Sequence, residues 1–244
     1  NNSAFVHKDL IKVDDPDSIT LDFSNPFRTG SGFIISGGSY VVTNKHVVEG
    51  WSRIQVRNGL GEMREASFVI MDAKEDLAVI GLKNPFKKDF SLSFQQIRDP
   101  RPGEEVFLMG YPLVGVFGDV YPTISEGIVS KVYGFQEARN GFILTAGMNP
   151  GNSGGPIFGE DGYVLGVAVA KLDKQEFLEE KGTLPEDVNT AIKSGSIIRF
   201  LESEGLLSSK GEEHSKINGR TYDAQSIYSV KRGSVVLIAV EGKE

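Results

Sequence analysis

The stretch NPGNSGGP at residues 149–156 constrains this chain more than any other feature. It is rich in Gly and Pro and lies between two apolar runs, at 142–144 and 163–170. Because Gly permits positive φ and close approach of another backbone, the chain bends sharply here and presents one small hydroxyl, that of Ser153. A nucleophilic serine needs this arrangement, with backbone N–H groups aimed where a carbonyl oxygen becomes negative. The alternative is a Gly-rich hairpin turn with an incidental serine.

The pentapeptide at 151–155 also matches G-x-S-x-G, the nucleophile elbow of α/β-hydrolases. That elbow must lead into a helix, and its acid and histidine must follow in the chain. Here a turn at 159–162 leads into the apolar run 163–170, which predicts a β-hairpin. The only downstream histidine, His214, lies in a polar tail. We therefore reject the elbow and favour the order His, Asp, Ser, with both partners upstream.

Composition limits the fold and the partners of the chain. Its 244 residues are 39% apolar and include 29 Gly, and its short apolar runs separated by turns predict an all-β protein. A net charge of −7 argues against nucleic acid or an anionic membrane surface as partner. The lack of Cys and the wide spacing of the three His argue against a metal site, and no run is long enough for membrane insertion as a helix.

The first set of strands is predicted to present His46. Residues 1–27 are mixed and polar, which predicts an N-terminal arm or edge strand. Two apolar runs across a Gly-Gly turn, at 33–36 and 40–43, then predict a hairpin. His46 follows this hairpin directly. A lone histidine at such a place is more often structural than catalytic, so its role depends on its partners.

Asp76 is the best candidate for that partner. It immediately precedes the nearly continuous apolar run 77–82, so its carboxylate is expected to be partly buried. Burial without a partner is costly, and an imidazole N–H is one natural partner. Asp72 and Glu75 are nearby competitors and rank lower because Asp76 adjoins the strand. A surface turn acid that merely starts the strand is the alternative.

A second set of strands is predicted beyond a connection at 98–103. A short helix at about 196–204 should follow them, N-capped by Ser and stopped by Gly205. The tail at 207–244 contains two further candidate strands, at 226–230 and 233–240. The strands of the second set are expected at 105–110, 123–132, 141–145, 163–170 and 188–192.

Seven motifs follow one another along the chain: GSGFII (30–35), TNKHVV (43–48), DLAV (76–79), GYP (110–112), SEGIVS (125–130), NPGNSGGP (149–156) and NTAI (189–192). In this order they resemble the motifs of the trypsin-like serine proteases, and within them the HtrA/Deg branch. The resemblance covers about residues 28–202 and implies two six-stranded antiparallel β-barrels with a short C-terminal helix. Barrel one would span about residues 28–100 and barrel two about 104–193, within a protease domain at 28–206.

The resemblance implies a role for each candidate residue. Ser153 would be the nucleophile, His46 the base that takes its proton, and Asp76 the acid that orients the imidazole. The backbone N–H groups of Gly151 and Ser153 would form the oxyanion hole. No metal or cofactor is required. Asn152 stands where digestive relatives carry Asp, so we do not expect activation by cleavage of the N-terminus.

The resemblance also implies the walls of the pocket for the substrate side chain before the cut bond, the P1 residue. Where a trypsin carries Asp at the pocket base, this chain has Gly147, so a buried Lys or Arg would lack a counter-ion. We expect a preference for small or medium aliphatic P1 residues. The expected lining residues are Gly147, Met148, Val169, Ala170, Lys171, Asn189 and Thr190.

The second apolar run of the tail has three possible structural roles. It could return to the first barrel as an edge strand, be donated to a neighbouring subunit, or begin a further domain. The residues after Leu206 are too few for the peptide-binding PDZ domain of many relatives. Because the chain begins Asn1-Asn2 and not with Met, we expect a processed protein, extracytoplasmic in location, with its signal peptide not visible.

Two functions of different classes follow. The first is a serine endopeptidase acting on unfolded or damaged polypeptides, as a possible homo-oligomer. The second is a protease-fold binding or scaffold protein whose triad is intact but unused. Drift would be expected to erode at least one member of an unused triad, so the sequence favours the enzyme.

Overall fold

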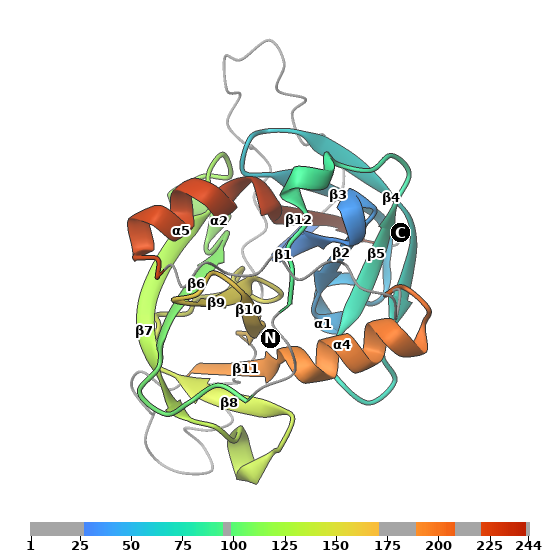
Figure 1. Cartoon of the computed structure of the whole chain (residues 1–244). Helices are drawn as coiled ribbons and strands as arrows, with labels where there is room; N and C mark the ends of the chain where they lie inside the picture. The colour runs from blue at the N-terminus through green and yellow to red at the C-terminus, as the bar shows by residue number, and fades with distance from the viewer. Residues whose placement is uncertain (1–26, 95–98, 171–188, 208–220, 243–244) are drawn as a thin grey trace.

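Two closed β-barrels make up the body of the molecule (Figure 1). The computed structural model describes residues 27–94, 99–170, 189–207 and 221–242. Each barrel has six strands, and neighbouring strands within both barrels run antiparallel. The predicted all-β class with two six-stranded barrels is therefore confirmed. Residues 1–26 of the expected N-terminal arm lie outside the described residues, and residue 27 opens the first strand.

Barrel one is closed by a strand from the far end of the chain. Its strand order is β1-β12-β3-β4-β5-β2. The bounds are β1 Phe27–Ile35, β2 Tyr40–Thr43, β3 Trp51–Asn58, β4 Met63–Met71, β5 Ala78–Leu82 and β12 Val235–Gly242. Five strands are thus sequential, and the sixth arrives after the whole of barrel two.

Barrel two has the order β10-β11-β8-β7-β6-β9. Its strands β9 and β10 form the hairpin predicted after the Gly-rich stretch, with Val167 opposite Pro156. The bounds are β6 Glu105–Gly110, β7 Thr123–Lys131, β8 Gly141–Leu144, β9 Pro156–Gly159, β10 Val164–Val169 and β11 Asn189–Lys193.

Strand alternation produces three apolar clusters, one inside each barrel and one between the barrels. Successive side chains of β1 point to opposite faces, as the pleat requires. Ile34 therefore packs inside barrel one, whereas Phe33 and Ile35 pack against barrel two. In β6 the same alternation sends Leu108 into barrel two and Phe107 into the cluster between the barrels. The barrels are consequently fixed to each other by a continuous apolar interface.

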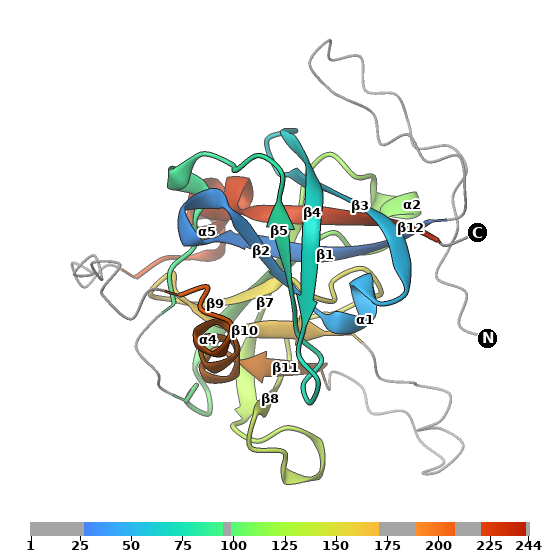
Figure 2. The same cartoon turned by 90° about the vertical axis from the view of Figure 1, so that its right-hand side faces the viewer.

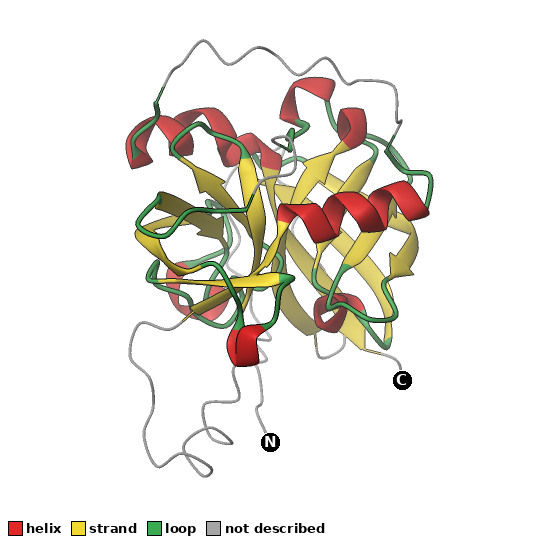
Figure 3. Ribbon diagram, turned by 60° about the horizontal axis from the view of Figure 1, so that its bottom comes forward, coloured by secondary structure: helices red, strands yellow, loops and turns green. Residues whose placement is uncertain are grey.

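Short helices lie around the strands (Figure 3). The C-terminal helix predicted after β11 is α4, Ser194–Ser203, and it ends before Gly205, whose φ is +68°. Its N-cap is Lys193 without a capping side chain, so the predicted Ser cap is wrong. The others are η1 Ser36–Gly38, α1 Lys45–Val48, η2 Lys88–Phe90, α2 Val114–Phe117, η3 Phe135–Glu137, α5 Ala224–Lys231 and η4 Arg232–Ser234.

The C-terminal region differs from its prediction in two ways. The candidate strand at 226–230 is helical and forms part of α5, because Asp223 caps it by accepting the N–H of Ser226 at 2.8 Å. The second candidate strand is β12, which lies between β1 and β3 in this chain's own barrel one (Figure 2). Of the three alternatives, return to the first barrel is the one observed. β12 is an internal strand of the closed sheet and pairs with a neighbouring strand on each of its edges.

Candidate active site

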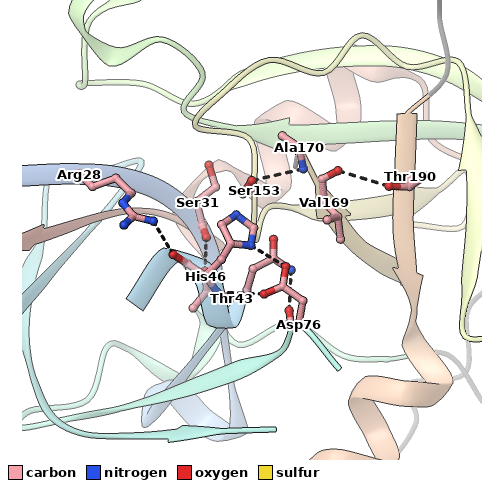
Figure 4. Close-up of polar contacts among 10 residues, drawn as sticks. Arg28, Ser31, Thr43, His46, Asp76, Ser153, Val169, Ala170 and Thr190 are labelled. Atoms are coloured by element: carbon pink, nitrogen blue, oxygen red, sulfur yellow. Dashed lines mark hydrogen bonds and ion pairs between the residues drawn. The ribbon is translucent and has the colours of Figure 1, made fainter. Parts of the chain in front are cut away.

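Asp76 contacts His46 at two points. Its Oδ1 accepts the backbone N–H of His46 at 2.9 Å, and its Oδ2 lies 2.5 Å from the imidazole Nδ1 (Figure 4). The backbone carbonyl of Asp76 accepts a further hydrogen bond from Asn44 Nδ2 at 2.9 Å. Because one carboxylate binds both the backbone and the ring, it fixes the ring orientation and favours the proton on Nδ1.

Barrel one holds His46 from its other side. His46 lies on α1, directly after β2, and its carbonyl accepts a hydrogen bond from Arg28 Nη1 at 2.7 Å. The next residues, Val47 and Val48, are buried in the core of barrel one. The side chains of His46 and Asp76 are 16% and 29% exposed, so water only partly screens their interaction. The second ring nitrogen faces the loop that carries Ser153 (Figure 4).

The two competing acids serve the turn that leads to Asp76. Oδ1 of Asp72 accepts the backbone N–H groups of Lys74 and Glu75 at 2.6 and 2.7 Å. This is the Asx-turn geometry in which an aspartate replaces a backbone acceptor. Asp72 therefore shapes the approach to β5, and Asp76 is the acid that meets the imidazole.

Ser153 lies in the loop between β8 and β9, with the imidazole of His46 between it and Asp76 (Figure 4). Its Oγ accepts the backbone N–H of Ala170 at 3.3 Å. Among the contacts between described residues, no hydrogen bond joins this Oγ to His46. Catalytic hydrogen bonds are often long without substrate and tighten when it binds. The structure thus brings together the three residues predicted from distant parts of the sequence.

The loop before Ser153 orients two backbone N–H groups. The carbonyl of Pro150 accepts the N–H of Leu113 at 2.9 Å, and the carbonyl of Asn152 accepts the N–H of Gly155 at 2.9 Å. In a trans peptide the N–H points opposite to the carbonyl, so these bonds aim the N–H groups of Gly151 and Ser153 away from their loop partners. These are the two donors predicted for an oxyanion hole. A positive φ of +101° at Gly151 makes this path possible.

Three backbone segments that are predicted to line the P1 pocket lie next to one another. Thr190 pairs with Ile143 of β8 and with Val169 of β10, so the ends of β8, β10 and β11 lie together. Asn189 donates its side-chain N–H to the carbonyl of Ala146 at 2.9 Å. These contacts place the predicted lining residues Gly147, Met148, Val169, Ala170, Asn189 and Thr190 on neighbouring segments, whereas Lys171 lies outside the described residues.

Comparison with known proteins identifies the family of this fold and site. A model of the trypsin-like peptidase domain matches residues 30–167, which is more than half of the chain. The chain belongs to the trypsin-like peptidase family. Two of the three relatives described below carry a serine protease activity in their names.

The relatives of this trypsin-like peptidase include HtrA-type proteases. Serine protease HTRA1 of Xenopus tropicalis is 32% identical over 194 residues, which is 77% of this chain and 38% of HTRA1. A probable periplasmic serine endoprotease of Brucella suis, DegP-like, is 33% identical over 71% of this chain and 35% of its own length. The uncharacterized protein y4bJ of Sinorhizobium fredii is 34% identical over 78% of this chain and 29% of its own. The chain therefore spans about a third of the length of these relatives.

Solved structures agree with the barrel architecture. The serine endoprotease from Yersinia pestis superposes with a TM-score of 0.58 at 25% identity, covering 72% of this chain and 61% of its own. The HtrA-type protease AlgW, solved with a decapeptide, superposes with a TM-score of 0.58 at 26% identity, covering 71% and 50%. Both matches exceed the similarity at which two chains share a fold.

Two residues of this peptidase site were not singled out from the sequence. Leu113, which holds the Pro150 carbonyl, has a left-handed φ of +45°, which is unusual for a leucine and has no sequence signal. Ser31 belongs to the motif at 30–35, which gives no signal that its hydroxyl contacts the nucleophile loop at the carbonyl of Gly151. The part of the chain that is described holds no cluster of residues suited to a metal ion, and none of its helices could span a membrane.

Proposed function

We propose that this chain is a serine endopeptidase that cuts peptide bonds with Ser153, His46 and Asp76. The observation that carries the proposal is the double contact of Asp76 with the backbone and imidazole of His46. A carboxylate engaged in this way fixes the proton on Nδ1 and leaves Nε2 free to act as a base. His46 lies beside the only serine of the Gly-rich stretch, Ser153, which supports the same assignment (Figure 4).

Acylation follows from this arrangement. Nε2 of His46 takes the proton from Ser153 as its Oγ attacks the scissile carbonyl, and the imidazolium that forms is stabilised by Asp76. The carbonyl oxygen becomes negative and accepts hydrogen bonds from the N–H groups of Gly151 and Ser153. Loss of one such donor in related enzymes costs about 3 kcal/mol of transition-state stabilisation. The intermediate collapses when His46 returns the proton to the leaving amine, which leaves an acyl-enzyme on Ser153.

Deacylation repeats the same steps with water as nucleophile. His46 now takes a proton from water, whose oxygen attacks the acyl carbon of the ester on Ser153. The same two N–H donors stabilise the second tetrahedral intermediate. The proton then passes from His46 to Oγ of Ser153, and the carboxylic acid product leaves. No external cofactor is consumed in this cycle.

The proposed P1 preference is for small or medium aliphatic residues. Among the described residues beyond its chain neighbours, no atom lies within 4 Å of the position that a Cβ on Gly147 would occupy, so no carboxylate of these residues lies at this wall. Met148 packs against the core of barrel two and presents an apolar surface beside it. A buried Lys or Arg side chain would therefore lack a counter-ion, whereas each buried methylene contributes about 0.8 kcal/mol.

The names of the relatives supply the proposed setting. The Brucella relative is called a periplasmic endoprotease, and AlgW an HtrA-type protease. From the first name we extend an extracytoplasmic location. Unfolded or damaged polypeptides as substrates, a role in protein quality control and assembly into a homo-oligomer are proposed on the resemblance of the motifs to the HtrA/Deg branch.

Labelling with a fluorophosphonate probe tests the activity. The purified chain should become covalently labelled and should degrade casein, and Ser153→Ala should abolish both. A chain that folds but neither reacts nor degrades casein would instead be a silent binding or scaffold protein of the protease fold. A peptide library read by mass spectrometry tests the pocket separately, since dominant cleavage after Lys or Arg would contradict the aliphatic preference.

A further inference from the structure

Ser31 links the two barrels at the nucleophile loop. It lies in β1 of barrel one and is completely buried. Its backbone N–H donates to the carbonyl of Ser153 at 2.8 Å, and its hydroxyl donates to the carbonyl of Gly151 at 2.6 Å. The same hydroxyl accepts the N–H of Tyr111 at 2.8 Å. One residue of barrel one thus makes three hydrogen bonds to barrel two, all of them at the loop of Ser153 or at the segment beside it.

Two glycines, Gly154 of the nucleophile loop and Gly110 of β6, leave room for this contact. A Cβ on Gly154 would lie 2.1 Å from the carbonyl oxygen of Ser31. A Cβ on Gly110, at the end of β6, would lie 2.8 Å from the hydroxyl of Ser31. Real Cβ atoms do not approach other atoms so closely, so a side chain at either position would push β1 away. The close approach of Ser31 to the loop therefore requires glycine at both of these positions.

The carbonyls of residues 150–153 are each held by one hydrogen bond. Leu113 holds that of Pro150, the hydroxyl of Ser31 that of Gly151, Gly155 that of Asn152, and the N–H of Ser31 that of Ser153. Each bond fixes the tilt of one planar peptide. The peptide held by the Ser31 hydroxyl lies between the two peptides that carry the oxyanion-hole N–H groups. If it rotates, both neighbouring donors change direction.

We propose that Ser31 is a positioning residue for the oxyanion hole of this enzyme. Its hydroxyl holds the Gly151 carbonyl, and this keeps the N–H groups of Gly151 and Ser153 converging on one point. Because Ser31 belongs to the barrel that carries His46, it also sets the position of that point relative to the catalytic base. The inference rests on the proposed function and assigns a role to a residue that touches neither the substrate nor the reacting atoms.

The substitution Ser31→Ala tests this role. It removes the hydroxyl and keeps both backbone hydrogen bonds of residue 31. We expect kcat for a peptide substrate to fall about 10- to 100-fold, less than the 10²–10³-fold known for loss of a whole donor, with KM changed less than threefold. Affinity for a peptide aldehyde, whose adduct places an oxyanion in the hole, should fall in parallel with kcat/KM.

A matched control separates positioning from stability. Ser196 is also buried, and its hydroxyl accepts a hydrogen bond from Arg199 Nη2 at 3.0 Å that stays within α4. Ser196→Ala should lower the melting temperature because it removes a hydrogen bond of a buried hydroxyl, although Ser31→Ala removes two. It should leave kcat and aldehyde affinity within twofold of wild type. Should Ser31→Ala fail to fold, Ser31→Cys fills the same space with a weak donor and should still lower kcat.

The outcomes distinguish this inference from the proposed function. An inactive wild-type chain that fluorophosphonate does not label overturns the proposed function and this inference with it. An active wild type with kcat unchanged in folded Ser31→Ala or Ser31→Cys overturns the role of Ser31 alone. A rise in KM at constant kcat also overturns it, because that result would assign Ser31 to substrate binding.

Discussion

Ser31 of β1 lies directly opposite Leu237 of β12 in the antiparallel ladder of barrel one. The strand that contacts the nucleophile loop is thus held on one edge by a strand from the C-terminal end of the chain. β12 pairs along its other edge with β3, so it joins two strands that would otherwise be free edges. Leu237 itself is buried in the cluster between the barrels. The position of Ser31 therefore depends on the last described strand.

A core substitution in β12 should consequently destabilise the whole protease body. Ile238 is buried inside barrel one, and Ile→Ala changes in cores cost about 2–5 kcal/mol. We expect Ile238→Ala to lower the free energy of unfolding in urea by this amount. Val230, 57% exposed on α5, is the control, and Val230→Ala should change it by less than about 0.5 kcal/mol. Equal effects of the two variants would mean that β12 is not an integral strand.

Local signals in the sequence predicted the strands, and the resemblance of its motifs to the trypsin-like proteases predicted the two barrels. Strand alternation, Gly-rich turns and the motifs around His46, Asp76 and Ser153 can each be recognised within a few residues. The partner of β12 could not be predicted in this way, because its pairing joins positions more than 200 residues apart, such as Arg28 and Val240. The sequence shows the apolar run, but the run alone fits three alternatives equally well: a strand of the first barrel, a strand donated to a neighbouring subunit, and the start of a further domain.

The error at 226–230 has a simple physical origin. The apolar residues Ile227 and Val230 suggest a strand when they are considered alone. In the structure Ile227 is buried, and Ala224 and Tyr228 pack against the same apolar cluster, a spacing of three and four residues that is typical of one face of a helix. Val230 is exposed. Asp223 decides between strand and helix by accepting the N–H of Ser226, a capping signal present in the sequence. Ser31 left no comparable signal, since a single serine in an apolar strand does not reveal what it contacts.

The acid of the triad can be tested against its nearest competitor. Asp76→Asn should keep the turn and the packing but lose the charge that stabilises the imidazolium and the acceptor that selects the tautomer. We expect kcat to fall about 10⁴-fold, as in relatives, with little change in melting temperature. Asp72→Asn is the control, because Asn supports the same Asx turn, and it should keep kcat within about threefold. A larger loss from Asp72→Asn would mean that Asp76 has been wrongly assigned.

The surroundings of Glu105 should make the free energy of unfolding depend on pH. Partial loss of hydration in the folded protein, and then the neighbouring carboxylates of Glu126 and Glu160, raise the pKa of Glu105, which remains an exposed residue. The folded state thus favours the protonated form, so the stabilisation is present at low pH and is lost as pH rises through the raised pKa. Glu105→Gln should therefore be more stable than wild type at pH 7, with the difference vanishing below about pH 4.

Thermal unfolding at several pH values measures this effect. Glu202, exposed on α4, is the control residue, and Glu202→Gln should not change stability across the same range. If Glu105→Gln were less stable than wild type at pH 7, the carboxylate would be favourable there and the sign of the effect would be wrong.

The close approach of β1 to the nucleophile loop can be tested at Gly154. Gly154 has φ +87°, and its Cβ would lie 2.1 Å from the carbonyl oxygen of Ser31 and 2.3 Å from Oγ1 of Thr43. Gly103 has a similar φ of +80°, but within the described part of the chain no atom beyond its chain neighbours lies within 4 Å of its Cβ position. Both Gly→Ala changes carry the left-handed backbone penalty of about 1–2 kcal/mol, and only Gly154→Ala adds the steric clash. The comparison therefore isolates the contact between β1 and the loop.

We expect Gly154→Ala to reduce the free energy of unfolding by about 1–3 kcal/mol more than Gly103→Ala does. Because the clash moves Ser31 away from the loop, the rate of fluorophosphonate labelling should also fall at least tenfold in Gly154→Ala. Gly103→Ala should retain the wild-type labelling rate, since its turn lies at the start of barrel two. Both quantities can be measured on the same preparations, by urea titration and by a time course of labelling. Equal labelling rates in the two folded variants would show that the spacing between Ser31 and the loop does not control the reactivity of Ser153.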